Sequence, residues 1–172
     1  MDFNLTEEQQ MLRTMARTFL TVECPKKLVR AMVEDERGYP PELWKKMAES
    51  GWMGLAIPEE YGGTGGSLLD LAILVEEMGR ACLPGPFFSS VVLAGLTLLE
   101  AGSEEQKREF LPRLANGELI LTLALTEQNG KYAAEAIKTV ATPNNKGSFI
   151  IRGTKLFVPD AHVADYIICV AR

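Results

Sequence analysis

Apolar residues recur at helical spacing through the first two thirds of the chain. Met11, Met15 and Phe19 lie four residues apart, which is the spacing of one face of a helix. Thr6 and Gln9, three residues apart just before them, form a capping-box pattern that predicts the helix start. Similar patterns of caps, prolines and glycines predict further helices over residues 25–34, 40–50, 67–82, 87–101 and 103–116.

Two of the predicted helices, over 67–82 and 87–101, are apolar on nearly every side. Such helices are buried on all sides in globular proteins. Methionine fills gaps in such cores, and we interpret four methionines as core packing and not as a cofactor contact: Met11, Met15, Met47 and Met78. The chain therefore has enough apolar surface for a substantial helical core.

The pattern changes after Gly117, where short β-rich runs replace the helical spacing. Strands are predicted over residues 119–125, 137–142, 148–152, 155–158 and 166–170, with a hairpin turn over 144–147. We predict two domains, a helical domain at 1–117 that folds alone and a β domain at 118–172. About 55 residues are few for an independent β domain. The predicted fold class is α+β, mainly α: a helical bundle followed by a partial antiparallel β domain.

Composition and charge exclude several classes of function. The chain has 172 residues, a formal net charge of −5 and an isoelectric point near 5.0, which disfavours binding to nucleic acid or to anionic membranes. Its three cysteines are far apart and it has a single histidine, so no zinc pattern is present. The longest apolar stretch, residues 87–99, is interrupted by serine, glycine and threonine, and no secretory signal is visible. We expect a cytoplasmic protein.

Five motifs in order resemble the acyl-CoA dehydrogenase family of flavoproteins. They are FNLTEEQQMLR at 3–13, GWMGLAIPEEYGG at 51–63, EEMGR at 76–80, GSEEQK with the following LP and GE pairs at 102–118, and LALTE at 123–127. None is decisive alone, but their order and spacing together are specific, and the resemblance covers essentially the whole chain.

The resemblance implies a subunit of three parts: a helical domain, a middle β domain and a C-terminal helical domain. FAD lies between the last two, and a carboxylate of the C-terminal domain removes the α proton of an acyl-CoA thioester while the flavin takes the β hydride. The 172 residues correspond to the first part and some of the second. The resemblance therefore implies no catalytic base in this chain, an acyl-CoA substrate, an electron-transfer flavoprotein or similar acceptor, and a homo-oligomer or hetero-oligomer.

The resemblance also implies flavin contacts at two segments. Leu125 and Thr126 stand where the family hydrogen-bonds the ring edge. Further along, Lys131 and Tyr132 replace the family's glycine and serine near the pyrophosphate. Glycine lets a backbone approach a ligand closely, whereas Lys131 offers a charge to a phosphate or is a solvated loop lysine, and both readings stay open.

The second segment, residues 155–160, departs further from the family pattern. Phe157 and Val158 take the positions of the aromatic residue over the flavin and its neighbour. Pro159 stands where the family has a hydroxyl near the flavin N5, and proline has no amide hydrogen to offer instead. Asp160 replaces an amide with a charge, and His162 is interpreted as an exposed turn residue.

The acyl pocket implied by the resemblance is lined by Leu74, Met78, Phe87 and Val91. Glu76 and Glu77 border it, and we interpret them as helix-surface charges and not as acid–base groups. The leading hypothesis is an FAD-dependent acyl-CoA dehydrogenase, with FAD held weakly or not at all by the 172 residues alone. The alternatives are a non-catalytic subunit that pairs with a complete partner and a structural helical domain without ligand.

Overall fold

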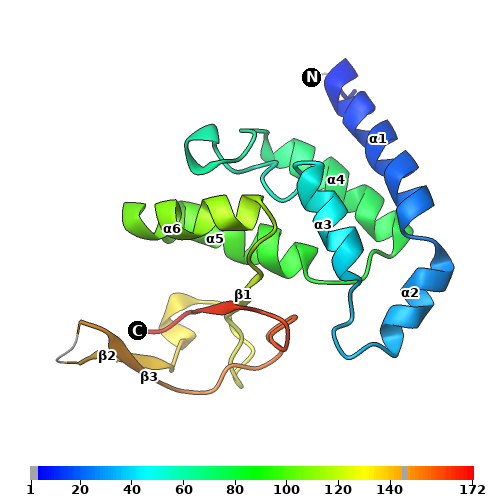
Figure 1. The fold of residues 1–172 in the computed structure, drawn as a ribbon. Helices are drawn as coiled ribbons and strands as arrows, with labels where there is room; N and C mark the ends of the chain where they lie inside the picture. The colour runs from blue at the N-terminus through cyan, green and yellow to red at the C-terminus, as the bar shows by residue number, and fades with distance from the viewer. Residues whose placement is uncertain (1–3, 145–146) are drawn as a thin grey trace.

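The computed structural model describes residues 4–144 and 147–172. Figure 1 shows most of the helices in the upper half of the molecule and the strands in the lower half. The helices are α1 (Glu7–Glu23), α2 (Lys26–Val33), α3 (Pro41–Glu49), the short η1 (Glu59–Tyr61), α4 (Leu68–Ala81), the π-helix η2 (Phe88–Gly95), α5 (Leu96–Ala101), α6 (Glu104–Ala115) and η3 (Ala134–Ala136). The strands are β1 (Leu121–Ala124), β2 (Val140–Pro143), β3 (Phe149–Arg152) and β4 (Tyr166–Cys169). The mainly helical α+β class is confirmed.

Capping residues fix the starts of three helices. The Thr6 hydroxyl accepts a hydrogen bond from the Gln9 amide at 3.2 Å, and the Gln9 side chain accepts one from the Thr6 amide at 3.1 Å. The same reciprocal pair starts α4 at Ser67 and α6 at Ser103. These caps satisfy amides that the helix leaves unpaired, and the predicted helix starts are confirmed.

The helix predicted over 87–101 consists of a π-helix followed by an α-helix. The π-helix η2 occupies its first part, and α5 continues it without a break. A Cβ on Gly95 would lie 2.9 Å from a Leu114 methyl, so the junction packs closely against α6. π-helical turns are rare and frequently found at functional sites.

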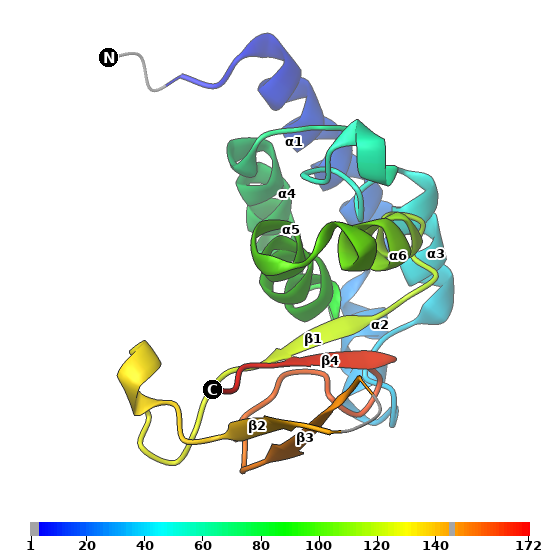
Figure 2. The same cartoon turned by 90° about the vertical axis from the view of Figure 1, so that its left-hand side faces the viewer.

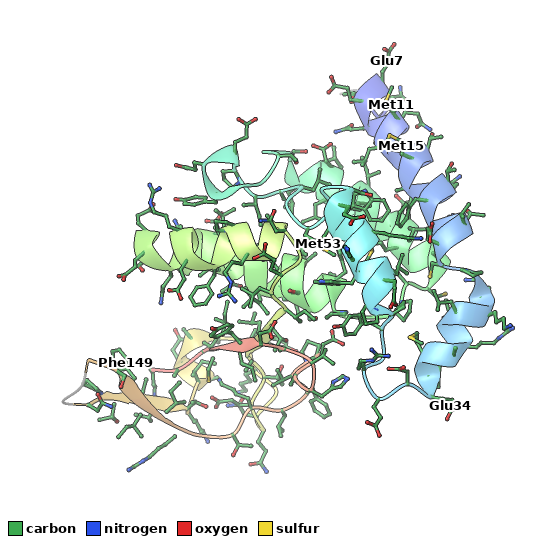
Figure 3. All side chains as sticks on the ribbon, viewed as in Figure 1. Glu7, Met11, Met15, Glu34, Met53 and Phe149 are labelled. Carbon is green, nitrogen blue, oxygen red and sulfur yellow. The ribbon has the colours of Figure 1, made fainter. Side chains whose placement is uncertain are left out.

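Exposure corrects part of the predicted core. Met11 and Met15 are 62% and 63% exposed, and they lie along the outer part of α1 in Figure 3. The prediction that they are core residues is wrong, because α1 buries its Ala16 and Leu20 face instead. Met47 and Met78 are buried as predicted. Leu68 and Leu69 at the start of α4 are exposed, so that helix is not buried on all sides.

One hydrophobic core joins the helices to the first strand. Met53, labelled among the helices in Figure 3, is fully buried within it. The core continues past Gly117 through Leu119 and Leu121. Figure 2 shows β1 and β4 side by side beneath the helices, with β2 and β3 farther out.

The strands form two separate pairs. β2 and β3 are antiparallel, as predicted, with Val140 opposite Arg152. β1 and β4 run parallel, with Leu121 opposite Tyr166, which differs from the antiparallel arrangement expected. The connection from β1 to β4 runs through residues 125–165 and includes β2 and β3, so it is long enough for the crossover that a parallel pair needs. Of the predicted hairpin turn, residues 145 and 146 lie outside the described residues.

Two global features bear on function. Within residues 4–144 and 147–172, no helix has the length and apolar character needed to cross a bilayer. In the same residues, no three histidine, cysteine, aspartate or glutamate side chains gather in a way that could hold a metal ion.

Ion pairs join α1 to α4. The buried Glu77 carboxylate receives Arg17 at 2.6 Å and Arg80 at 2.7 Å, and Glu76 pairs with Arg13 at 2.8 Å. The hydrogen bond from Arg17, helped by Arg80, lowers the pKa of Glu77 to about 2. The interpretation of Glu77 as a helix-surface charge is wrong, because its side chain is only 1% exposed.

Glu77→Ala is expected to lower the free energy of unfolding at neutral pH by about 1.5–3 kcal/mol, because it removes a buried carboxylate that accepts hydrogen bonds from two half-exposed arginines. Since folding lowers this pKa from 4.5 to about 2, the contribution of Glu77 is present above about pH 4.5 and disappears as the pH falls toward 2. Urea unfolding at several pH values measures both effects. Glu76→Gln is the matched control, because its exposed pair contributes about 0–1 kcal/mol.

Equal stability of Glu77→Ala and the wild type at neutral pH would contradict this. So would a difference between them that grows, instead of shrinking, as the solution is acidified.

Candidate functional site

The end of β1 presents hydrogen-bonding groups that the protein leaves unused. The carbonyls of Leu125 and Thr126 accept hydrogen bonds from the Lys155 ammonium at 3.2 Å and the Leu156 amide at 2.9 Å. Across the described residues, the Leu125 and Thr126 amides and the Thr126 hydroxyl have no such partner. Both residues are half-buried. Unused donors on a held strand end suit a ligand with fixed acceptor atoms.

This donor set fits a flavin ring edge, whose ring nitrogen and oxygen atoms accept hydrogen bonds. The protein's share in cofactor chemistry is to bind and orient the ring and to tune its electronics. Leu125 and Thr126, which the sequence singled out, are therefore suitably built for that role.

The segment after Lys155 is not the predicted strand. Phe157 has a φ of 52° and Asp160 a φ of 51°, values in the left-handed region that non-glycine residues rarely adopt. The prediction of a strand over 155–158 is wrong, because the left-handed Phe157 takes the chain out of the extended conformation that a strand needs. Leu156 donates to the end of β1, and the Pro159 carbonyl accepts from the Thr122 hydroxyl at 2.6 Å.

This conformation leaves Phe157 90% exposed. Val158 beside it is half-buried. A free aromatic face at this position can cover a flat ring, whereas Pro159 has no amide hydrogen to donate there. His162 lies in the exposed turn that follows.

A polar seam, made by Ser89, Ser90, Thr122 and Asp160, ties this segment to η2. The buried Ser89 hydroxyl donates to the Asp160 carboxylate at 2.5 Å, and the Ser90 hydroxyl accepts from the Leu121 amide at 2.9 Å. The Asp160 charge is thus held against η2. The two serines were visible in the sequence as polar interruptions of an apolar run, but nothing in the sequence indicated their partners.

Lys131 and Tyr132 lie on the exposed connection between β1 and η3. The Lys131 amide donates to the Asn129 side chain at 2.9 Å, which shapes the turn. Neither side chain makes a hydrogen bond or ion pair with the described part of the chain. The structure therefore does not join them to Leu125 and Thr126.

The four residues of the expected acyl pocket are all buried in the core, Leu74 and Met78 on α4 and Phe87 and Val91 at and within η2. Met78 and Phe87 line a hollow of about 190 Å³, together with Val75, Gly79, Cys82, Leu83, Gly85 and Phe88. Leu74 and Val91 do not line it. Exposed Phe88, the neighbour of Phe87, forms part of its wall.

Comparison with known proteins identifies relatives of this arrangement. Residues 6–118 match the acyl-CoA dehydrogenase N-terminal domain family. The chain is 39% identical, over 92% of its length and 40% of the relative's, to acryloyl-CoA reductase (NADH) from Anaerotignum propionicum. It is 38% identical, over 99% of its length and 45% of the relative's, to a short-chain-specific acyl-CoA dehydrogenase from Clostridium acetobutylicum.

A solved structure agrees with these matches. Acyl-CoA dehydrogenase from Bacillus anthracis, complexed with FAD, superposes with a TM-score of 0.83 at 30% identity, covering 98% of this chain and 29% of that one. The chain thus spans less than half the length of these proteins. With the motifs, the fold and the matched residues in agreement, the chain belongs to the acyl-CoA dehydrogenase family.

Proposed function

We propose that the chain forms one wall of an FAD-dependent acyl-CoA dehydrogenase site. The observation that carries this is the pair of unused amides and the hydroxyl at Leu125 and Thr126, in a chain that belongs to that family. The proposed reaction is α,β-dehydrogenation of an acyl-CoA thioester. Bound FAD would accept the β hydride, and a base that the described residues do not supply would remove the α proton.

The chain's own residues would bind and orient. Leu125 and Thr126 would hold the ring edge, and the exposed Phe157 would cover a ring face beside Val158. The hollow lined by Met78 and Phe87 would take part of the acyl chain. Lys131 and Tyr132 would approach the pyrophosphate only if their exposed turn packs against it. A homo- or hetero-oligomer and an electron-transfer flavoprotein or similar acceptor are proposed as partners.

A second candidate is a non-catalytic subunit that pairs with a catalytic one. Pro159 cannot donate a hydrogen bond to the flavin N5, and the Asp160 carboxylate is engaged by Ser89. Both departures would weaken flavin chemistry while leaving the fold intact. Flavin bound without acyl-CoA-dependent reduction in the assembled protein would favour this candidate.

The 172-residue chain expressed by itself is expected to purify colourless. Phe157 and Tyr132 are exposed, so the candidate ring and pyrophosphate contacts form an open surface and not an enclosed pocket. Small-molecule sites usually bury most of their ligand. Visible absorbance of the purified chain checks this, and a stoichiometric flavin spectrum would contradict it.

The same chain is also expected to show no acyl-CoA-dependent reduction of an artificial electron acceptor, even with added FAD. Its glutamates near the acyl pocket are paired with arginines, and the lowered pKa of Glu77 makes it a weak base. A dye-reduction assay with short and long acyl-CoA substrates measures this. Turnover that Glu77→Gln abolishes would show that the carboxylate is catalytic.

A further inference from the structure

A buried ion pair lies directly beside the proposed flavin edge. The Lys155 ammonium and a Glu127 carboxylate oxygen are 2.8 Å apart, and the two side chains are only 8% and 6% exposed. Burying two charges is costly, and their attraction repays it only with good geometry and further hydrogen bonds. Neither Lys155 nor Glu127 has a chemical role in the proposed reaction.

Three further hydrogen bonds satisfy the Glu127 carboxylate. It accepts from the Lys138 amide at 2.8 Å, the Thr139 amide at 2.9 Å and the Thr139 hydroxyl at 2.7 Å. The hydrogen bonds from Lys155 and Thr139 hold the pKa of Glu127 far below its ordinary value. Glu127 therefore stays charged and ties the segment before β2 to the end of β1.

Lys155 and the residue after it bind the end of β1 as well. Its ammonium donates to the Leu125 carbonyl at 3.2 Å, and the next amide, of Leu156, donates to the Thr126 carbonyl at 2.9 Å. The two residues proposed to meet the flavin edge therefore have their carbonyls occupied from one side. What remains unused is their amides and the Thr126 hydroxyl.

The backbone before Lys155 also lies unusually close to Thr139, which hydrogen-bonds Glu127. A Cβ on Gly153 would lie 2.8 Å from the Thr139 Cα, closer than side chains pack against a backbone. Because Gly153 has no side chain, the backbone of residues 153–155 can lie against Thr139. The ion pair consequently joins three segments: the end of β1, the approach to β2 and the 155–158 segment.

We propose that Lys155 and Glu127 form a positioning pair for the flavin. By occupying the Leu125 carbonyl and holding the 155–158 segment to the end of β1, the pair leaves the Leu125 and Thr126 donors available to the ring. The inference rests on the proposed function, in which Leu125 and Thr126 contact FAD. Neither charge touches the ring in this account.

The test uses the isotope-labelled 172-residue chain and the double variant Glu127→Gln/Lys155→Met. The double variant leaves no unpaired buried charge, keeps an acceptor for Thr139 and fills the lysine's space. Amide hydrogen exchange reports the Leu156 bond without any flavin. Titration with FAD to millimolar concentration, followed by amide chemical shifts at residues 125, 126, 157 and 158, reports the flavin edge.

In the double variant we expect the Leu156 amide to exchange at least about 10-fold faster than in the wild type, relative to the helical core. The FAD concentration for half-maximal shifts should rise by at least about 10-fold, because the Leu125 and Thr126 donors are no longer held in place before FAD binds. Glu77→Gln is the matched control, because it also neutralises a buried, paired carboxylate but lies between α1 and α4. It should lower global stability and leave both local readouts unchanged.

The outcomes separate the two proposals. Shifts at 125 and 126 that are present in the wild type and unchanged in the double variant would overturn the positioning role alone. We expect this open surface to bind FAD only near millimolar concentration, which agrees with a chain that purifies colourless. Absence of the shifts in the wild type even at that concentration would overturn the proposed function and the positioning role with it. Lys155→Met is a second variant, and if circular dichroism shows both variants unfolded, the pair is a folding determinant and the proposal fails.

Discussion

A chain that ends at Gly117 is expected to lose most of the stability of one that ends at Leu125. The shorter chain lacks Leu119, Ile120 and Leu121, which are buried in the helical core. Each buried aliphatic side chain contributes about 1.5–3 kcal/mol, so the loss is about 5 kcal/mol or more. Whole domains are stable by only about 5–15 kcal/mol. Thermal unfolding of the two chains by circular dichroism measures the difference.

The longer chain is itself the control, since it keeps β1 without β4. A hydrogen bond supports the same expectation, because the buried Ser90 hydroxyl accepts from the Leu121 amide and would lose that partner. Equal melting temperatures would show that the helices close their core without β1. We therefore propose that the helical unit ends after β1 and not at the predicted boundary of 117.

The sequence predicted the helix starts well because the hydrogen bonds that fix them join residues close together in the chain. Thr6, Ser67 and Ser103 each meet a partner three residues away, so the sequence contains the whole interaction. The exposure of Met11 and Met15 could not be predicted in this way. Which face of α1 is buried depends on its packing against α4, a helix whose Glu77 lies about 60 residues along the chain from its partner Arg17.

The candidate site shows the same limit. Leu125 and Thr126 were singled out by resemblance, and the structure adds that their carbonyls are occupied and their donors unused. The left-handed conformation of Phe157 has no signature in the sequence, because it follows from bonds to distant residues. The sequence pattern predicted Lys155 as part of a strand. Only the fold shows that Lys155 is buried against Glu127.

The glycine-rich motif at 51–63 is explained by packing alone. Its chain folds back on itself: the Gly65 amide donates to the Ile57 carbonyl at 2.9 Å, and the Gly66 amide donates to the Leu55 carbonyl at 2.7 Å. A Cβ on Gly63 would lie 2.5 Å from the Ile57 carbonyl carbon and 2.6 Å from the Gly54 oxygen. Both atoms belong to the backbone, so no side-chain rotation can relieve the contact.

Gly63→Ala is therefore expected to lower the free energy of unfolding by about 3 kcal/mol or more, the range of substitutions that force a backbone to move. Gly79→Ala is the matched control, because no atom lies within 4 Å of its added Cβ and it sits inside α4. Alanine there should stabilise the protein by about 0.5–1 kcal/mol. Urea unfolding of both variants gives the comparison, with opposite signs expected. If Gly63→Ala proves as stable as the wild type, this turn is not held by its backbone, and the motif must be explained by a ligand or partner instead.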